Sequence, residues 1–257
     1  MSHPPLNVTL LLDKTFVARV EHYPRLGSTN DRAREAAAEG GDLPLLIVAD
    51  EQTAGRGRGM NRWWTGPGSL AFSLLMDVED LRIDRPRAPL VALAAAVAVV
   101  EAVVPLLESH VVGVHWPNDV FVDGRKLAGI LVETLSPRLY VIGVGLNTNN
   151  SLADAPQDLR SRVATLRDLA GQPQNQTVIL LAILENLARL LVRLGATPER
   201  VAARADALCL QKGRQLVLDT GRGLLEGRCA GIAGDGALLL TTSDGLRAVS
   251  NGVIRET

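Results

Sequence analysis

The sequence predicts an α+β protein, with alternating helices and strands over residues 1–208 and a small β-rich part over residues 209–257. Two observations carry this prediction. Apolar runs of strand length alternate with longer helix-forming runs in the first part. From Gly213 the pattern changes to short β-rich runs separated by Gly and Asp turns, which is typical of a small antiparallel barrel. We therefore expect two domains with their boundary at residues 208/209.

The first elements surround a Gly-Ser-Thr-Asn-Asp sequence. Val20–Tyr23 predicts a strand, and Ser28 with Asp31 forms a capping-box pattern before the helix-forming run 33–39. Gly40 ends that helix. Residues 1–20 hold a short helix or strand and are too few for a helix-turn-helix domain.

The middle of the chain predicts the buried elements. Leu45–Ala49 is a continuous apolar strand, and Ser69–Met76 predicts the next strand after a Pro-Gly turn. Ala88–Leu107 predicts an alanine-rich helix buried on most sides. Asp123-Gly124 predicts a hairpin, because Asp-Gly between apolar runs favours a tight turn. The strands expected around that hairpin are Val111–His115, Val120–Val122, Ile130–Thr134 and Leu139–Gly145.

The remaining helices and strands follow the same logic. Gly171 ends a short helix over 163–170, and Gly195 ends an amphipathic helix over 177–194. A further helix runs from Pro198 to Leu208. The strands expected in the C-terminal part are Gln215–Asp219, Leu224–Ile232, Ala237–Thr241 and Leu246–Ser250.

Composition limits the function classes. The net charge of −1 disfavours a generally basic nucleic-acid-binding surface. The longest apolar run, Leu90–Val100, is shorter than the ~20 residues that cross a bilayer. The N-terminus lacks the basic start of a signal peptide, and Cys209 and Cys229 form neither a disulfide framework nor a metal-ligand spacing. We therefore expect a cytoplasmic protein without a membrane partner.

Residues 52–64 form the most informative stretch. Three glycines alternate with Arg56 and Arg58, and Trp63 follows. Glycine lets a ligand approach the backbone, and arginine binds carboxylates and phosphates. If the loop is extended, Arg56 and Arg58 share a face and Trp63 offers a stacking surface. The spacing is neither a P-loop nor a dinucleotide fingerprint. The same pattern occurs in solvated loops and RNA-binding segments, so the loop alone leaves these alternatives open.

Four motifs occur in order along the chain: Gly27–Asp31, Gln52–Trp64, Trp116–Val120 with Arg125–Glu133, and Gly143–Asn149. Together they resemble the biotin–protein ligase family, in the form without an N-terminal DNA-binding domain. The resemblance is close over residues 20–150. It implies a mixed, largely antiparallel central sheet flanked by helices, as in class II synthetases, and an SH3-like C-terminal barrel.

The resemblance also implies a reaction. Biotin is activated by ATP with Mg²⁺ to biotinyl-5′-AMP and pyrophosphate, and biotin then passes to a lysine of a biotin carboxyl carrier protein of acetyl-CoA carboxylase. No enzyme nucleophile is needed, which agrees with the absence of an obvious Ser/His/Asp or Cys/His set. The family implies no DNA partner here, and it leaves a monomer and a homodimer both open.

The resemblance assigns roles to individual residues. Lys126 and Arg58 are the expected catalytic cations. The expected biotin contacts are Ser28, Thr29, Asn30, Gln52, Arg56, Gly57, Arg58, Lys126 and Gly129. The expected nucleotide contacts are Arg58, Trp63, Asn118, Lys126 and Asn147. Asp119 is a candidate Mg²⁺ ligand, and orientation of Lys126 or a structural role are its alternatives. Gly129, Gly143 and Gly145 are expected to let the ligand approach the backbone.

The sequence departs from the family in two places. His115 stands where the family usually has lysine, and histidine is only partly charged near neutral pH. Met60 and Asn61 replace a glycine and an arginine of the common bacterial loop, and Arg62 is a candidate replacement for the missing charge.

Three other functions compete with this interpretation. A lipoate–protein or octanoyl transferase shares the architecture, but Gln52 and the 28–30 polar cluster favour a ureido ring over an alkyl chain. A nucleic-acid-binding protein would need more than one short basic patch. A biotin-responsive repressor would need a DNA-binding domain.

Overall fold

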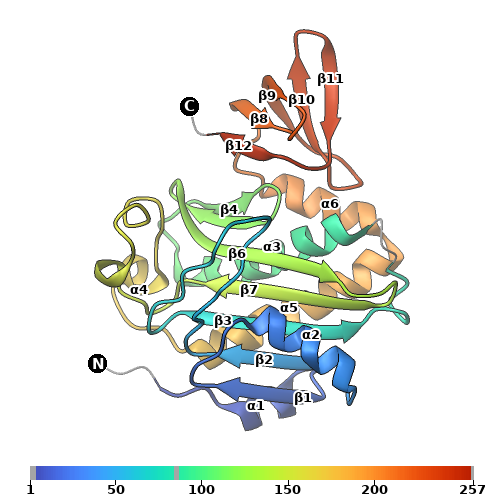
Figure 1. Ribbon diagram of the computed structural model, residues 1–257. Coiled ribbons are helices and arrows are strands. Elements are labelled where there is room, and N and C mark those ends of the chain that lie inside the picture. The colour runs from blue at the N-terminus through green and yellow to red at the C-terminus, as the bar shows by residue number, and fades with distance from the viewer. Residues whose placement is uncertain (1–3, 84–86, 256–257) are drawn as a thin grey trace.

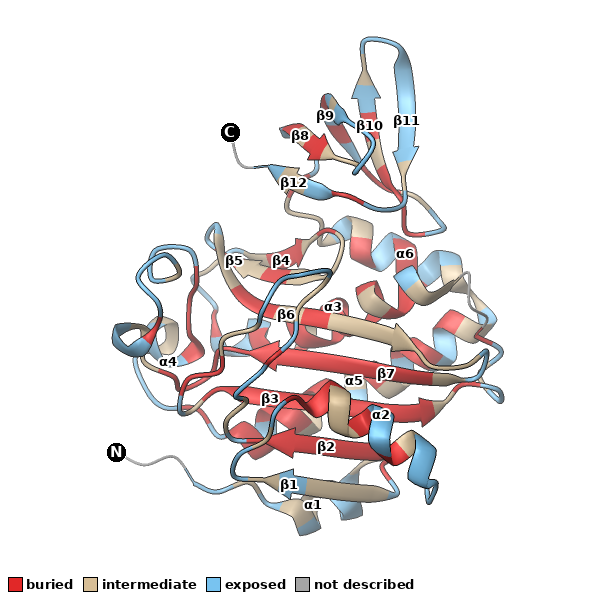
Figure 2. Cartoon of the chain, viewed as in Figure 1, coloured by how far each residue is buried: buried red, intermediate tan, exposed pale blue. Residues whose placement is uncertain are grey.

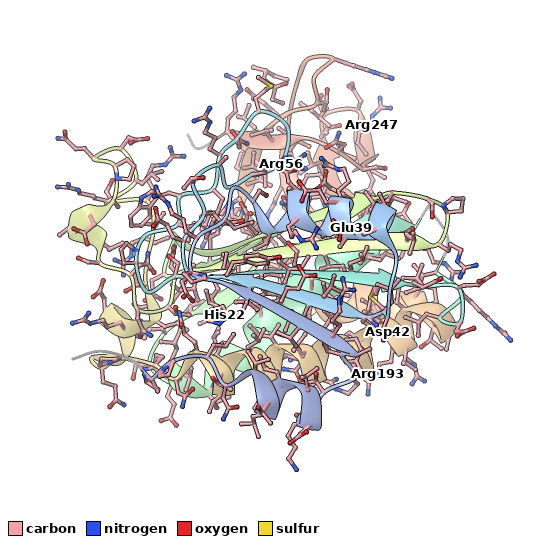
Figure 3. All side chains as sticks on the ribbon, turned by 60° about the horizontal axis from the view of Figure 1, so that its bottom comes forward. His22, Glu39, Asp42, Arg56, Arg193 and Arg247 are labelled. Atoms are coloured by element: carbon pink, nitrogen blue, oxygen red, sulfur yellow. The ribbon has the colours of Figure 1, made fainter. Side chains whose placement is uncertain are left out.

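The computed structural model describes residues 4–83 and 87–255. A seven-stranded sheet forms the centre of the molecule, with helices on both faces and a second, smaller sheet above it (Figure 1). Helices α3 and α5 pack together behind the large sheet, whereas α2 contacts β2, β3 and β7 from the front. This arrangement confirms the predicted α+β class. Figure 3 shows side chains tipped with nitrogen and with oxygen spread over the surface.

The large sheet has the strand order β1-β2-β3-β7-β6-β5-β4. Among these strands, β1 and β2 run parallel and every other neighbouring pair is antiparallel. The strands are β1 (Arg19–Tyr23), β2 (Leu45–Ala49), β3 (Leu70–Asp77), β4 (Val112–His115), β5 (Asp119–Val122), β6 (Arg125–Thr134) and β7 (Leu139–Leu146). The mixed, largely antiparallel sheet implied by the resemblance is therefore present.

The helices surround this sheet. They are α1 (Val8–Lys14), α2 (Thr29–Glu39), α3 (Ala88–Val103), α4 (Leu166–Ala170), α5 (Gln176–Ala196) and α6 (Pro198–Ala207), with short 3-10 turns at Val104–Leu106 and Leu152–Asp154. Small and β-branched residues dominate α3, so the sheet and α5 approach it closely and most of its side chains are buried. In the described part of the chain, the stretch Ala88–Leu106 is apolar and long enough to cross a bilayer, but 72% of it is buried inside the protein.

The predicted hairpin is confirmed at Asp123-Gly124, where both residues have positive φ values, 47° and 78°. Positive φ at both central residues is the geometry that Asp-Gly favours between twisted strands. The strand after the turn begins at Arg125, five residues earlier than expected. Lys126 and Gly129 therefore lie in the sheet and not in a loop before it.

The capping box predicted at the start of α2 is wrong. Ser28 is the N-cap residue, but its side chain makes no capping hydrogen bond. The Asp31 carboxylate accepts hydrogen bonds from Arg34 and Arg56 instead. Two guanidinium groups compete better for this carboxylate than a backbone N–H does, because ionised pairs form the stronger bonds.

The predicted end of α5 is also wrong, because the helix continues through Gly195 to Ala196. An added Cβ at Gly195 would lie 1.8 Å from the carbonyl oxygen of Leu81. This glycine therefore provides space for a neighbouring segment and does not terminate the helix.

The C-terminal part is a five-stranded antiparallel sheet with the order β11-β10-β9-β8-β12. Its strands are β8 (Gln215–Asp219), β9 (Leu224–Ile232), β10 (Leu238–Thr242), β11 (Gly245–Val249) and β12 (Val253–Arg255). In the described residues the edge strands β11 and β12 do not pair, so closure into a barrel is not shown. β11 is largely exposed, whereas β2, β3 and β7 are largely buried (Figure 2). Cys209 and Cys229 are free thiols.

We predict that Gly195→Ala destabilises the protein by about 1–3 kcal/mol, because the methyl group must displace the Leu81 carbonyl. Urea denaturation measures the change. Gly234→Ala is the matched control, since its added methyl group meets no atom within 4 Å and the expected change is below about 1 kcal/mol. Equal stability of Gly195→Ala and the native protein would contradict this role of Gly195.

Candidate functional site

One face of the neighbouring strands β6 and β7 carries three positions without side chains. Gly129 pairs with Gly145 across the two strands, and Gly143 lies two residues before Gly145, so all three share one face of the sheet. We call Gly129, Gly143 and Gly145 the glycine patch. Added Cβ atoms would lie 2.3 Å from the Trp63 ring at Gly145 and 2.0 Å from Asn30 Oδ1 at Gly143.

The patch was expected to let a ligand approach the backbone. In the structure the side chains of Trp63 and Asn30 lie against Gly145 and Gly143. The glycines therefore act by giving two predicted site residues a place directly on the sheet.

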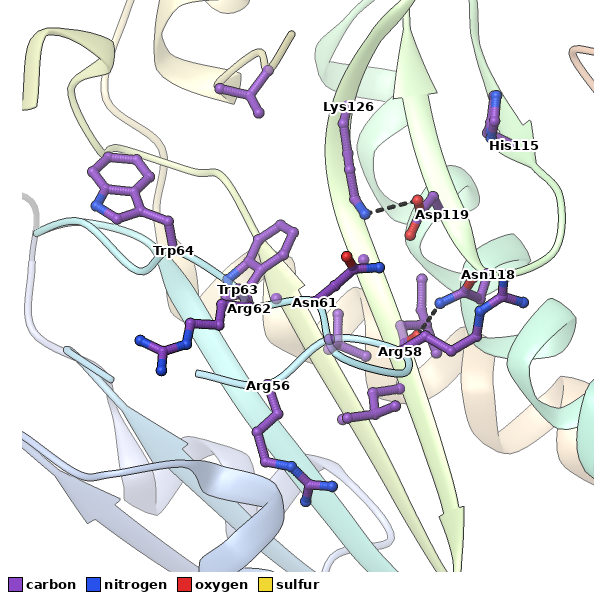
Figure 4. Close-up of a pocket in the computed structure, with 18 of the residues that line it drawn as sticks. Arg56, Arg58, Asn61, Arg62, Trp63, Trp64, His115, Asn118, Asp119 and Lys126 are labelled. Atoms are coloured by element: carbon purple, nitrogen blue, oxygen red, sulfur yellow. Dashed lines mark hydrogen bonds and ion pairs between the residues drawn. The ribbon is translucent and has the colours of Figure 1, made fainter. Parts of the chain in front are cut away.

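A cavity of about 860 Å³ covers the glycine patch (Figure 4). Residues from α2, from the 52–64 loop and from β4 to β7 line it. Every site residue predicted from the sequence lines this cavity: Ser28, Thr29, Asn30, Gln52, Arg56, Gly57, Arg58, Trp63, Asn118, Asp119, Lys126, Gly129 and Asn147. The structure thus brings together motifs that are about 120 residues apart in the chain.

A hydrogen-bonded group of polar side chains forms one end of the cavity. Gln52 Oε1 accepts from the backbone N–H of Thr29 at 2.8 Å and from its hydroxyl at 3.1 Å, while Gln52 Nε2 donates to Thr65 at 3.2 Å. Ser73 of β3 lies behind them, with its Oγ 2.8 Å from the Thr29 hydroxyl. Ser73 and Thr65 were missed by sequence reasoning. The one feature of the sequence that could have indicated Ser73 is that its hydroxyl interrupts the apolar run of β3.

Asn30 connects this polar end to β6. Its Oδ1 accepts from the Ser73 hydroxyl at 2.6 Å, and its Nδ2 donates to Glu133 Oε2 at 2.7 Å. Burial alone would raise the Glu133 pKa, but hydrogen bonds from Asn30 and Arg56 and the charges of Arg56 and Arg34 outweigh it, so the pKa is lowered. Glu133 is therefore a partly buried anion beside the cavity.

Arg56 is held between two carboxylates. Its guanidinium donates to Glu133 Oε1 at 3.0 Å and Oε2 at 3.1 Å, and to Asp31 at 2.8 Å. Burial lowers the pKa of Arg56, but the hydrogen bonds and charges of the two carboxylates raise it further, so the net shift is upward.

Arg58 extends in a different direction from Arg56 (Figure 4). Its guanidinium donates to the Asn251 side chain at 3.3 Å and to the Gly252 carbonyl, both in the C-terminal part. Within residues 4–83 and 87–255, no carboxylate forms an ion pair with Arg58, and burial lowers its pKa. Arg56 and Arg58 were expected to share a face if the loop is extended, but the chain reverses directly after Arg58, where the Asn61 N–H donates to the Arg58 carbonyl, and the two side chains diverge.

Lys126 projects from β6 toward the middle of the cavity (Figure 4). Its ammonium lies 2.7 Å from Asp119 Oδ2 and 5.7 Å from the centre of the Trp63 ring. Asn118 donates to the Ile130 carbonyl and thus fixes the turn before β5. Of the alternatives for Asp119, the structure favours orientation of Lys126.

Trp63 and Asn147 line the aromatic end of the cavity, and Asn150 lies next to Asn147. Trp63 Nε1 and Asn150 Oδ1 are buried without a hydrogen bond to any described residue. Asn150 donates to Asn147 Oδ1 at 3.2 Å, so both amides belong to one buried group. Buried polar atoms normally have partners, so this end of the cavity suits a ligand with its own donors and acceptors.

The residues that depart from the family pattern lie around the cavity. His115 lines it and stacks on Phe121, with ring centroids 4.2 Å apart. Asn61 and Arg62 also line it, whereas Met60 is 99% exposed. In the described part of the chain, no group of three or more His, Cys, Asp or Glu side chains could hold a metal ion.

Two further segments complete the wall and carry no recognisable motif. Residues 159 and 161–163 come from the loop before α4, and residues 253–255 come from β12. The backbone N–H of Lys126 donates to the Arg162 carbonyl at 2.8 Å, which fixes the first segment beside β6. Sequence reasoning missed both segments, because β12 was not foreseen and the loop has no periodic pattern.

The cavity therefore combines a polar end, an aromatic surface and two cations. Comparison with known proteins identifies the family. Residues 24–149 match the model of the biotin/lipoate A/B protein ligase family. The biotin–[acetyl-CoA-carboxylase] ligase of Mycobacterium tuberculosis is 31% identical over 259 residues, which cover 97% of this chain and 95% of that protein. This chain belongs to the biotin/lipoate A/B protein ligase family.

Two other relatives agree with the family assignment. The bifunctional ligase/repressor BirA of Bacillus subtilis is 32% identical over 231 residues, covering 87% of this chain and 70% of BirA. The structure of biotin protein ligase from Aquifex aeolicus in complex with biotin and ATP has a TM-score of 0.81 at 25% identity. That match covers 93% of this chain and all of the Aquifex chain, so the fold of this family extends through the C-terminal sheet.

Proposed function

We propose that this ligase activates biotin with ATP to biotinyl-5′-AMP and transfers the biotin to a lysine of a biotin carboxyl carrier protein. The observation that carries the proposal is the single cavity that joins the polar Thr29–Gln52 end to the cations Arg58 and Lys126. Biotin has a polar ureido ring at one end and a carboxylate at the other, so it matches both ends of this cavity. The names of the relatives support the same substrates.

Biotin occupies the polar end in this proposal. Ser28, Thr29, Asn30 and Gln52 offer hydroxyl and amide groups to the ureido ring, beside Gly57 and Gly129. An alkyl chain would form no hydrogen bonds with these groups, whereas the ureido ring offers them both donors and an acceptor. This favours biotin over the lipoate or octanoyl groups that other members of the family carry.

ATP occupies the aromatic and cationic end. Trp63 and Asn147 lie where the adenine binds in this proposal, and the unpaired Trp63 Nε1 is a donor available to the nucleotide. Arg58 and Lys126 face the carboxylate and the α-phosphate. Both reactants are anions, so cations between them reduce their repulsion and stabilise the charge that develops in the transition state.

The reaction needs two displacements. A biotin carboxylate oxygen attacks the α-phosphorus of ATP, and the bond to the pyrophosphate leaving group breaks. The amine of the acceptor lysine then attacks the carbonyl carbon of the mixed anhydride, AMP leaves, and the amine loses a proton. The protein supplies position and charge, and no side chain forms a covalent intermediate.

In this proposal Mg²⁺ would bind the phosphates and offset part of their negative charge. The protein offers Mg²⁺ few ligands. Asp119 is paired with Lys126, and the described residues contain no group of three or more His, Cys, Asp or Glu side chains that could hold a metal ion. Mg²⁺ commonly binds through one or two carboxylates together with substrate phosphates, and Asp119 is the candidate carboxylate here.

The remaining features of the proposal follow from the same assignment. Residues 1–208 form the catalytic domain and residues 209–257 the C-terminal domain. The ligase works in the cytoplasm on a carrier protein and does not bind DNA. Its oligomeric state is either monomer or homodimer.

We predict that Lys126→Ala lowers biotin-dependent exchange of pyrophosphate into ATP by at least about 100-fold, because one preorganised contact to the developing charge is lost. Lys14→Ala, in an exposed part of α1, is the control and retains the native rate. Lipoate in place of biotin supports no exchange. Native rates in Lys126→Ala, or exchange driven by lipoate, would contradict the proposed function.

His115→Lys tests the departure from the family pattern. The substitution places the lysine that the family usually has at the wall of the cavity. We predict that the exchange rate is maintained or raised, because an ammonium group at this wall can contact the phosphates. A severe loss of exchange, with the thermal stability unchanged, would show that the imidazole itself is required.

A further inference from the structure

The two arginines of the loop have partners of different charge. Arg56 is bound by the carboxylates of Asp31 and Glu133, whereas Arg58 is bound by a neutral amide and a neutral carbonyl. The local Gly/Arg pattern does not distinguish Arg56 from Arg58, because both arginines lie between glycines. Their surroundings assign them different tasks.

We propose that Arg56 is a positioning residue whose guanidinium is anchored on Glu133, and that Glu133 couples the loop to Asn30 at the polar end of the cavity. The proposal rests on the proposed function and deepens it. The substrate anions are then bound by Arg58 and Lys126, while Arg56 lines the biotin site through its main chain.

Glu133 is the centre of this arrangement. Its two oxygens accept both terminal nitrogens of Arg56, at 3.0 and 3.1 Å, as well as Arg34 and Asn30 at 2.7 Å each. The two-bond contact fixes the orientation of the guanidinium plane as well as its position. One carboxylate of β6 thus holds both α2 and the start of the 52–64 loop.

The charges around Arg56 are already balanced. Arg34 and Arg56 face Asp31 and Glu133, so two cations meet two anions. A substrate carboxylate that bound Arg56 would have to displace Glu133 and leave that half-buried charge without its main partner. Leaving a buried charge without its partner is destabilising, so a substrate anion gains little binding free energy by contacting Arg56.

Arg58 presents the opposite case. Its neutral acceptors can be exchanged for an anion with a net gain, because hydrogen bonds between ionised groups are stronger than those to neutral groups. Burial already lowers its pKa, although the charge of Asp119 acts in the other direction. An incoming phosphate or carboxylate would therefore relieve Arg58 of an unfavourable environment.

Glu133 also determines which atom Asn30 presents to the glycine patch. A carboxylate needs a donor, so the Asn30 amide nitrogen faces Glu133 and its Oδ1 lies against Gly143. The Ser73 hydroxyl donates to the same Oδ1, which fixes the amide from the other side. Asn30 then offers an acceptor to a ligand N–H, as the cyclic urea of biotin requires.

A double-mutant cycle tests the anchor. Glu133→Ala, Arg56→Ala and the double variant are compared by the KM for biotin and by kcat in the exchange assay. We expect each single variant to raise the KM for biotin about ten-fold, and the double variant to raise it no further, because both single changes break one interaction. The KM for ATP should change less than three-fold in all three variants.

Two comparisons separate positioning from a general structural effect. Arg34→Ala removes another partner of Glu133 without touching the loop, and it should change the KM for biotin less than two-fold. Glu133→Gln keeps an acceptor for Arg56 and should recover part of the affinity lost in Glu133→Ala. Arg58→Ala should instead lower kcat by at least about 100-fold, since it removes a charge that acts in the transition state.

Three results would overturn the proposal. One is additive losses in the double variant. Another is a kcat loss in Arg56→Ala as large as that in Arg58→Ala while Glu133→Ala stays native. The third comes from hydrogen exchange of residues 53–62, a measurement that does not depend on enzyme activity. The proposal predicts faster exchange in Glu133→Ala and Arg56→Ala but not in Arg34→Ala. Unchanged exchange in all three variants would contradict the anchor even if the proposed reaction fails.

Discussion

The site depends on one steric constraint, which is that three positions on neighbouring strands have no side chain. Gly129, Gly143 and Gly145 leave one patch of β6 and β7 without side chains, so Trp63 and Asn30 lie directly on the sheet. Any larger residue at Gly143 or Gly145 would overlap an atom of these side chains. The cavity above the patch can then be lined both by α2 and by the 52–64 loop, although neither belongs to the sheet.

Electrostatics divides that cavity into two parts. At one side Glu133 and Asp31 neutralise Arg56 and Arg34, which makes this part a rigid support. At the other side Arg58 bonds to neutral groups, so its positive charge remains available to anions, and Lys126 lies nearby, paired with Asp119. A reaction between two anions needs both properties, because the reactants must be held in place as well as screened from each other.

Local patterns in the sequence predicted most elements, and the family resemblance implied which residues belong to the site. The hairpin at Asp123-Gly124, the buried strand β2 and the alanine-rich helix α3 each follow from short-range rules. Partners chosen by tertiary contact could not be predicted in this way. Asp31 was assigned to a capping box, whereas two arginines bind it. Glu133 carried no local signal of its role, since its partners lie 77 to 103 residues away in the chain. β12 is three residues long, too short for a periodic pattern.

The most direct test of this account is a crystal structure of the protein with biotin and a non-hydrolysable ATP analogue. The account predicts that the ureido ring lies beside Asn30 and Gln52 and the adenine beside Trp63. The biotin carboxylate and the α-phosphate should meet between Lys126 and Arg58, with Arg58 released from Asn251 and Arg56 still bonded to Glu133. Ligands bound away from the glycine patch, or Arg56 turned from Glu133 to the phosphate, would contradict it.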